Sequence, residues 1–166
     1  LRCETVDMDR VVDDAIETVR GQIESAGQSL EVRVTPGVTL EGDQTRITQV
    51  VANLLNNAVK YSEHGGRITL TLVATADDVI LDVADTGIGM TGEQVRRAFD
   101  LFSQAAPQAA RSQGGRGIGL ALVRMLVQLH GGTTALESDG LGLGSTARVR
   151  LPRTMRLPAA VTDRRW

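Results

Sequence analysis

The 166-residue chain has 18 lysines and arginines against 20 acidic residues, and its net charge of -2 leaves no general basic surface that would gather nucleic acid. Hydrophobic residues make up 42% of the chain and charged residues 23%, which is typical of one globular domain with a buried core. The single cysteine, Cys3, excludes an internal disulfide and fits a reducing compartment. The longest apolar helical stretch, residues 118–129, is interrupted by Arg124 and is too short to span a bilayer.

The first half of the chain shows two helical patterns, each followed by a strand pattern. Apolar residues between Val11 and Ile23 recur at helical spacing, which predicts an amphipathic helix. The segment SLEVRV alternates as a strand does, and Asp43 is suited to cap a second helix. The expected elements are a helix over 8–26, a strand over 29–34, a helix over 43–61, and a hairpin of strands over 67–74 and 79–84.

The second half places regular elements between glycine-rich segments. A short helix over 91–99 leads into DLFSQAAPQAARSQGGRG, which has no clean period and predicts a long loop, either a functional cover or disordered. A helix over 117–129 is apolar nearly all round, which predicts that it is buried. TTALES and STARVRLP, separated by DGLGLG, predict a closing hairpin. We expect one domain over 1–152 and a frayed tail or linker over 153–166.

The opening residues, LRCETVD, start abruptly. Such a start is typical of a piece cut from a longer protein, and an unusual natural start is the alternative. We expect the former.

The pattern G-x-G-x-x-G occurs in LDVADTGIGMTGEQ, between a predicted strand and a predicted helix. A dinucleotide-binding turn of this kind opens a crossover helix into a second parallel strand, with an acidic residue about 20 positions further on. Here that position falls in the Gln-, Ala- and Gly-rich loop. The context argues against a dinucleotide site and favours a turn that serves another ligand.

Asp85 ends the strand just before these glycines. Because side chains alternate along a strand, Asp85 shares a face with Val79, Leu81 and Val83, which are expected to point into the core. A buried carboxylate needs a hydrogen-bond donor, from the protein or from a ligand. Two interpretations stay open from these residues alone: a carboxylate satisfied by the protein's own amides, as at a helix cap, and a carboxylate that binds a ligand.

Polar residues form a narrow stripe on the second helix, beside its apolar face. At about 100° per residue, Asn53, Asn57 and Lys60 fall on one arc, with Asn56 and Tyr61 on either side of it. Amide oxygens can coordinate a hard cation, and an ammonium group can bind phosphate. A solvated polar face is the alternative interpretation.

The segment GGRGIGL, residues 114–120, brings glycines to the start of a helix. Free backbone amides at a helix N-terminus make an anion site, and a flexible hinge is the alternative. The Walker pattern G-x-x-x-x-G-K-[ST] does not occur in the sequence.

Taken in this order, four segments resemble the catalytic ATP-binding domain of sensor histidine kinases, in the superfamily built on the Bergerat fold. NLLNNAVKYS resembles the N box, DTGIGM the first glycine box, FDLFSQ the F box and GGRGIGLALV the second glycine box. HGG and GSTARVRLP also match, and the resemblance covers about Val6 to Pro152. Each box alone is a weak signal, but four in the right order indicate shared ancestry.

The resemblance implies an α/β (α+β) two-layer sandwich: a mixed, largely antiparallel sheet with helices on one face and a mobile lid over about residues 100–116. It implies binding of Mg-ATP and donation of the γ-phosphoryl group to a histidine on a separate dimerisation domain, with a response regulator receiver domain downstream. A cytoplasmic location follows, including the cytoplasmic part of a membrane-bound sensor. Neither nucleic acid nor the membrane surface is an expected partner.

The resemblance also implies roles for individual residues. Asp85 would accept a hydrogen bond from the adenine amino group, and Asn57, assisted by Asn53, would hold magnesium. Asn53, Lys60 and the lid residue Arg111 would form the catalytic set, with Lys60 and Arg111 on the phosphates. The other nucleotide-binding residues implied are Tyr61, Gly87, Gly89, Met90, Phe102, Gly115, Arg116, Gly117, Ile118, Gly119, Leu120 and Thr146.

Two positions depart from relatives on the same fold. Arg116 stands where the family usually has a small hydroxyl residue, which leaves its effect on the lid open. Asn53 stands where the chaperone, topoisomerase and mismatch-repair ATPases have a glutamate that activates the nucleophile, and an amide is a poor general base. An ATP-gated ATPase of this kind is the alternative function, and a degenerate domain that acts only through protein contacts is a third possibility.

His64 and His130 lack the acidic neighbour of an acceptor histidine, so the chain is expected to supply only the donor half of the reaction.

Overall fold

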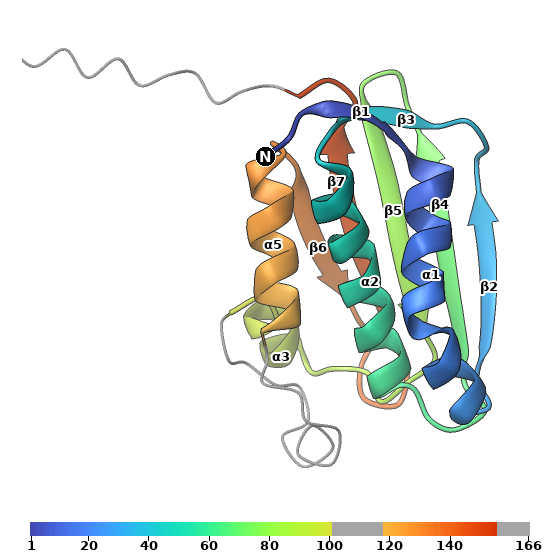
Figure 1. Ribbon diagram of the computed structural model, residues 1–166. Coiled ribbons are helices and arrows are strands. Elements are labelled where there is room, and N and C mark those ends of the chain that lie inside the picture. Colours follow the sequence, from blue (N-terminus) through green and yellow to red (C-terminus); the bar gives the residue numbers. More distant parts are fainter. Residues whose placement is uncertain (101–117, 156–166) are drawn as a thin grey trace, which may run out of the picture.

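A computed structural model describes residues 1–100 and 118–155 as a two-layer structure, in which α1, α2 and α5 lie side by side on one face of a five-stranded sheet (Figure 1). This confirms the predicted sandwich. The described elements are β1 (Glu4–Asp7), α1 (Met8–Ser25), β2 (Ser29–Val34), β3 (Thr39–Gly42), α2 (Gln44–Tyr61), β4 (Arg67–Ala74), β5 (Asp78–Asp85), α3 (Gly92–Arg97), α5 (Gly119–Leu129), β6 (Thr133–Glu137) and β7 (Ser145–Pro152).

The main sheet has the strand order β2-β4-β5-β7-β6. β2 and β4 pair in parallel, because the chain between them crosses back through β3 and α2, and the other neighbours pair antiparallel. Both predicted hairpins, β4–β5 and β6–β7, are confirmed. A separate sheet of β1 and β3 was not predicted, because strands of 4 residues are too short to show a clear alternation.

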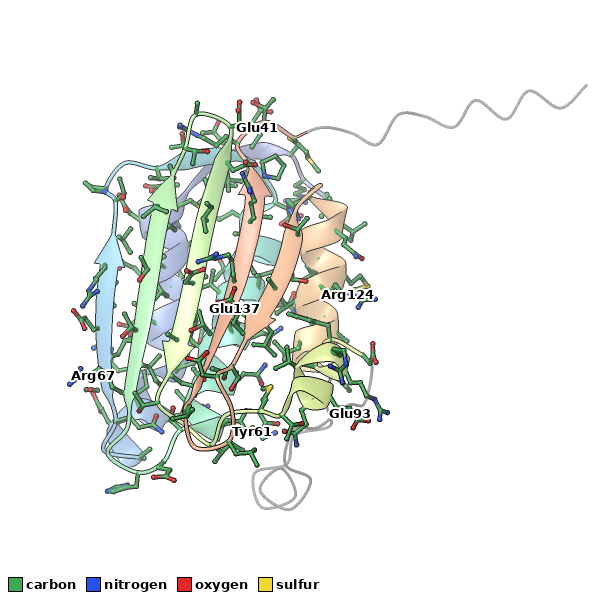
Figure 2. The ribbon with its side chains drawn as sticks, turned by 180° about the vertical axis from the view of Figure 1, so that it is seen from behind. Glu41, Tyr61, Arg67, Glu93, Arg124 and Glu137 are labelled. Atoms are coloured by element: carbon green, nitrogen blue, oxygen red, sulfur yellow. The ribbon has the colours of Figure 1, made fainter. Side chains whose placement is uncertain are left out.

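The core is aliphatic and lies between the sheet and the helices. Every second residue from Ile68 to Leu72 in β4 and from Val79 to Val83 in β5 is buried, as the alternation predicts. The opposite face of the sheet, seen from behind in Figure 2, carries charged side chains. Arg148 pairs there with Asp82 at 2.7 Å. The aliphatic core and the two cavities described below lie on the helical side of the sheet.

The prediction that the helix over 117–129 is buried is wrong. α5 begins at Gly119 and buries Val123, Leu126 and Val127, whereas Met125 and Leu129 are each 51% exposed. The helix packs at the edge of the helical layer, against α2 and β6, and its far side is left uncovered by the described residues. No helix within 1–100 and 118–155 combines the length and hydrophobicity needed to cross a bilayer.

His130 joins the end of α5 to the start of α2. Its side chain is 3% exposed; Nε2 accepts the backbone N–H of Asp43 at 3.1 Å, and Nδ1 lies 2.7 Å from the carbonyl oxygen of Leu126. Because Nε2 accepts, Nδ1 carries the proton and donates. Asp43 is the predicted cap of α2: backbone N–H groups of Arg2 and Arg46 donate to its carboxylate and hold the pKa of that group below its ordinary value.

We expect His130→Ala to lower the free energy of unfolding by about 2 kcal/mol, because the backbone groups that it joins lose their partner away from bulk water. Urea denaturation followed by circular dichroism measures the change. The exposed His64 supplies the control, and His64→Ala should cost less than about 0.5 kcal/mol. Equal losses in the two variants would contradict this role of His130.

Candidate nucleotide-binding site

Asp85 lies at the end of β5, on the face of the sheet that the helices cover. One carboxylate oxygen accepts the N–H of Gly87 at 2.8 Å, and the other accepts the hydroxyl of Ser145 at 2.9 Å. Burial raises the pKa of Asp85, although these hydrogen bonds act in the opposite direction. A carboxylate has about four acceptor positions, so each oxygen can still accept from a ligand. The two interpretations of Asp85 are therefore compatible.

Asp85 lines a narrow pocket between α2, the sheet and the start of α5. The predicted residues Tyr61, Met90, Leu120 and Asn57 also line it. Its other walls are mainly aliphatic. The pocket encloses only about 30 Å³, so a flat base that presents a hydrogen-bond donor to the carboxylate must displace part of the walls as it enters.

The structure does not bring Thr146 into this pocket. In the register of β5 and β7, Ser145 is the residue that lies opposite Asp85. Ser145 shares the helical side of the sheet with the buried Val149 and Leu151, so Thr146 points to the open side. We therefore correct the predicted contact from Thr146 to Ser145. The alternation at the end of β7 was the sequence signal for this choice.

Gly87 and Gly89 shape the pocket by packing against the protein's own backbone. A Cβ at Gly87 would overlap the carbonyl oxygen of Tyr61, and a Cβ at Gly89, where φ is +65°, would overlap that of Gly140. The N–H of Ile88 donates to the Tyr61 carbonyl at 3.1 Å. The turn after β5 thus packs tightly against the end of α2. This close contact requires glycine at position 87 even without a ligand.

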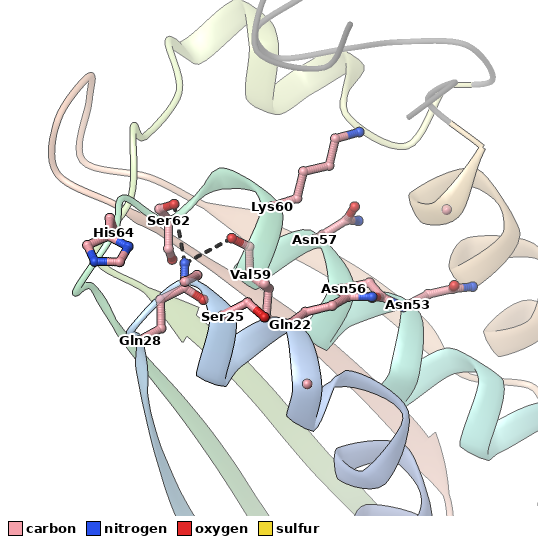
Figure 3. A pocket seen from close by; sticks show the side chains of 13 residues that line it. Gln22, Ser25, Gln28, Asn53, Asn56, Asn57, Val59, Lys60, Ser62 and His64 are labelled. Carbon is pink, nitrogen blue, oxygen red and sulfur yellow. Dashed lines mark hydrogen bonds between the residues drawn. The ribbon is translucent and has the colours of Figure 1, made fainter. Parts of the chain in front are cut away.

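A larger cavity of about 810 Å³ opens along α2 (Figure 3). It brings together the predicted Asn53, Asn57 and Lys60 with Gly119, and no Asp or Glu is among the described residues that line it. A Cβ at Gly119 would lie 3.8 Å from both amide atoms of Asn57. The start of α5 therefore lies close to Asn53 and Asn57, which we call the asparagine row, and Asn57 lines both cavities.

Donor groups in the larger cavity lack partners among the described residues. Nδ2 of Asn53 is buried without a hydrogen bond to any of them. Nζ of Lys60 lies 5.3 Å from the ring centroid of Tyr61, and burial lowers its pKa. The cavity thus contains a buried amide donor and, two turns further along α2, an ammonium group that pairs with no described carboxylate, and this combination favours an anionic ligand.

The asparagine row also fits a metal ion that arrives with its ligand. Residues 1–100 and 118–155 contain no cluster of His, Cys, Asp or Glu that could hold a cation by itself. Magnesium does not need such a cluster, because it commonly binds through one or two protein oxygens together with phosphate oxygens and water. The amide oxygens of Asn57 and Asn53 are of that kind.

The start of α5 adds backbone donors to the cavity. Its cap residue, Ile118, forms no side-chain hydrogen bond to the first turn, so these N–H groups have no side-chain cap. Gly119 lines the larger cavity and Leu120 the narrow pocket. The other predicted residues lie outside the described ranges: Phe102, Arg111, Gly115, Arg116 and Gly117.

Residues 42–155, more than half of the chain, match the family described as histidine kinase-, DNA gyrase B- and HSP90-like ATPase. The chain belongs to this ATPase family. Histidine protein kinase DivJ of Caulobacter vibrioides is 38% identical over 162 residues, which cover 92% of this chain and 26% of DivJ. The chain thus spans about a quarter of that member of the ATPase family.

Solved structures of sensor histidine kinases have the same fold as this chain. The mycobacterial sensor histidine kinase MprB superposes with a TM-score of 0.80 at 30% identity, covering 93% of this chain and 100% of the solved one. Full-length ShkA in complex with AMPPNP superposes with a TM-score of 0.79 at 28% identity, covering 95% of this chain and 32% of ShkA. The predicted relation to the catalytic domains of sensor histidine kinases is confirmed.

Proposed function

We propose that this member of the ATPase family binds Mg-ATP and donates its γ-phosphoryl group to a histidine on a separate dimerisation domain. The observation that carries the proposal is Asp85, a half-buried carboxylate with open acceptor positions in an apolar pocket. A purine there would direct its phosphates towards Asn57, because Asn57 lines both cavities.

Each residue then has a defined task. Asp85 accepts the adenine amino group, while Tyr61 and Met90 pack around the base. Asn57, assisted by Asn53, would hold magnesium, which would supply charge neutralisation to the phosphates. Lys60 and the first-turn amides of α5 bind phosphate oxygens, and Arg111 stays a predicted further cation.

Transfer needs alignment and charge neutralisation more than covalent help from the protein. The bond between the γ-phosphorus and the oxygen of ADP breaks, and a bond to an imidazole nitrogen of the acceptor forms. ADP leaves with the electron pair of the broken bond, and the ring proton of the imidazole passes to solvent. This chain's residues hold the donor in place for the acceptor.

An ATP-gated ATPase of the chaperone, topoisomerase or mismatch-repair type is the alternative function. Such an enzyme must activate water, which needs a general base near the γ-phosphate. Asn53 offers an amide where those ATPases have glutamate, and the larger cavity has no carboxylate among its described lining. Both features favour transfer to a protein acceptor over hydrolysis.

The partners of the proposed reaction lie outside this chain. His130 is buried with both ring nitrogens engaged, and His64 is followed by Gly65 rather than by an acidic residue. We propose an acceptor histidine on the protein's own dimerisation domain, a response regulator receiver domain that takes the phosphoryl group next, and a cytoplasmic location.

Incubation with γ-labelled Mg-ATP tests the proposal. The chain alone should take up almost no label, and a supplied histidine-bearing dimerisation domain should be labelled at a rate that depends on this chain. The His64→Ala variant should label the acceptor as the wild type does. Rapid release of inorganic phosphate without an acceptor would favour the ATPase alternative.

A further inference from the structure

The loop between β6 and β7, residues 138–144, closes over the glycine turn, residues 86–90. Two backbone N–H groups of the loop, those of Gly142 and Gly144, donate to carbonyl oxygens of the turn at 2.7 and 3.1 Å. The loop and the turn thus form one hydrogen-bonded unit at the edge of the narrow pocket.

Ser138 is the side chain that holds this unit together. Its Oγ accepts the N–H of Met90 at 3.0 Å and that of Gly140 at 3.4 Å, and it donates to the carbonyl oxygen of Gly144 at 2.7 Å. A hydroxyl has one donor and two acceptor positions, so all three are used. Ser138 therefore adds side-chain hydrogen bonds within the loop, and one to the N–H of Met90, to the two backbone hydrogen bonds that join the loop to the turn.

Met90 connects Ser138 to the base pocket. Its side chain is 7% exposed and lines the pocket together with Asp85. At the other end of the turn, Gly87 donates to Asp85. The glycine turn is thus anchored at both ends, to Asp85 at its start and to Ser138 at its finish. Release of the second anchor would let Met90 move relative to the carboxylate.

We propose that Ser138 is a positioning residue for the adenine base: through the N–H of Met90 it sets the position of Met90 in the wall of the pocket that Asp85 also lines. This inference rests on the proposed ATP binding. Ser138 lines neither described cavity, so it acts on the base through Met90 and not on the phosphates. Its loss should therefore weaken nucleotide binding and leave the transfer step itself unchanged.

Steady-state phosphorylation of a supplied acceptor domain tests this division. In Ser138→Ala, the KM for Mg-ATP should rise about tenfold, with kcat within about twofold of the wild type, as the loss of one positioning interaction predicts. The preference for ATP over inosine triphosphate, which lacks the amino group, should fall in the same variant. Ser138→Thr keeps the hydroxyl and should restore the KM.

Thr75→Ala is the matched control. The Thr75 hydroxyl accepts the N–H of Asp78 in the turn between β4 and β5, so its removal also frees a turn N–H, but away from the pocket. This variant should keep the wild-type KM. An unchanged KM in Ser138→Ala, an equal rise in Thr75→Ala, or a loss confined to kcat would overturn the inference.

The failure of a variant to fold and the failure of the wild type to bind nucleotide have different consequences. If Ser138→Ala does not fold, Ser138→Cys, which keeps the size and weakens the hydrogen bonds, should show the same rise in KM, and a wild-type KM in that variant would overturn the inference. A wild-type chain that binds no nucleotide would overturn the proposed function, and the inference with it.

Discussion

Asp85→Asn should reduce the affinity for Mg-ATP by about 100-fold or more, because an amide group replaces the acceptor that the adenine amino group needs in an apolar pocket. Isothermal titration calorimetry measures the change. Asp82→Asn is the matched control, since Asp82 lies in the same strand on the outer face and pairs with Arg148. Wild-type affinity in the Asp85 variant, or an equal loss in the control, would reject the adenine role.

The same substitution should leave the unliganded fold at least as stable at pH 7. Burial raises the pKa of Asp85, so the folded state disfavours the ionised form. Stability that the wild type has below the ordinary carboxyl pKa of about 4 is lost as the pH rises through the raised value. Asparagine does not titrate, so the difference in unfolding free energy should shrink as the pH falls towards 3. A variant that is much less stable at pH 7 would mean that the hydrogen bonds from Gly87 and Ser145 to the carboxylate outweigh the cost of its burial.

Asn57→Ala should lower the rate of phosphoryl transfer to a supplied acceptor by about 100-fold, because the metal and the phosphates lose the side chain that faces both cavities. Calorimetry with and without magnesium separates the metal role from base binding. The variant should lose the affinity gained from magnesium and keep its weaker binding of free nucleotide.

Asn56→Ala supplies the comparison, because Asn56 directly precedes Asn57 on α2 and lines only the larger of the two cavities. It should retain most of the transfer rate and the response to magnesium. If both alanine variants lose activity alike, the asparagines of α2 contribute in general and Asn57 has no special role with the metal.

The fold was predictable wherever one periodicity covered many residues. α1, α2, β4 and β5 alternate between buried and exposed positions clearly enough to be located within a residue or two. β1 and β3 were not predicted, because each strand is short and their pairing joins segments far apart in the chain. The exposure of Met125 and Leu129 was not predicted, because hydrophobicity alone does not show which side of a helix a neighbouring element covers.

The site was predictable where chemistry and position coincided. A carboxylate on the buried face of a strand is unusual enough to single out Asp85, and the asparagine row lies on one arc of α2. The resemblance implied Thr146, whereas the alternation along β7 places Ser145 on the helical side of the sheet, opposite Asp85. Leu54, Ala58, Val83, Leu136 and Ala147 also line the pocket. Their pattern predicts burial, but only the packing of α2 on the sheet decides which buried residues border a cavity.

A crystal structure with magnesium and a non-hydrolysable ATP analogue is the most direct test of the central claim. We expect the adenine amino nitrogen within about 3 Å of a carboxylate oxygen of Asp85, and the phosphates between Asn57, Lys60 and the start of α5. A base bound elsewhere, with Asp85 hydrogen-bonded only to Gly87 and Ser145, would contradict it.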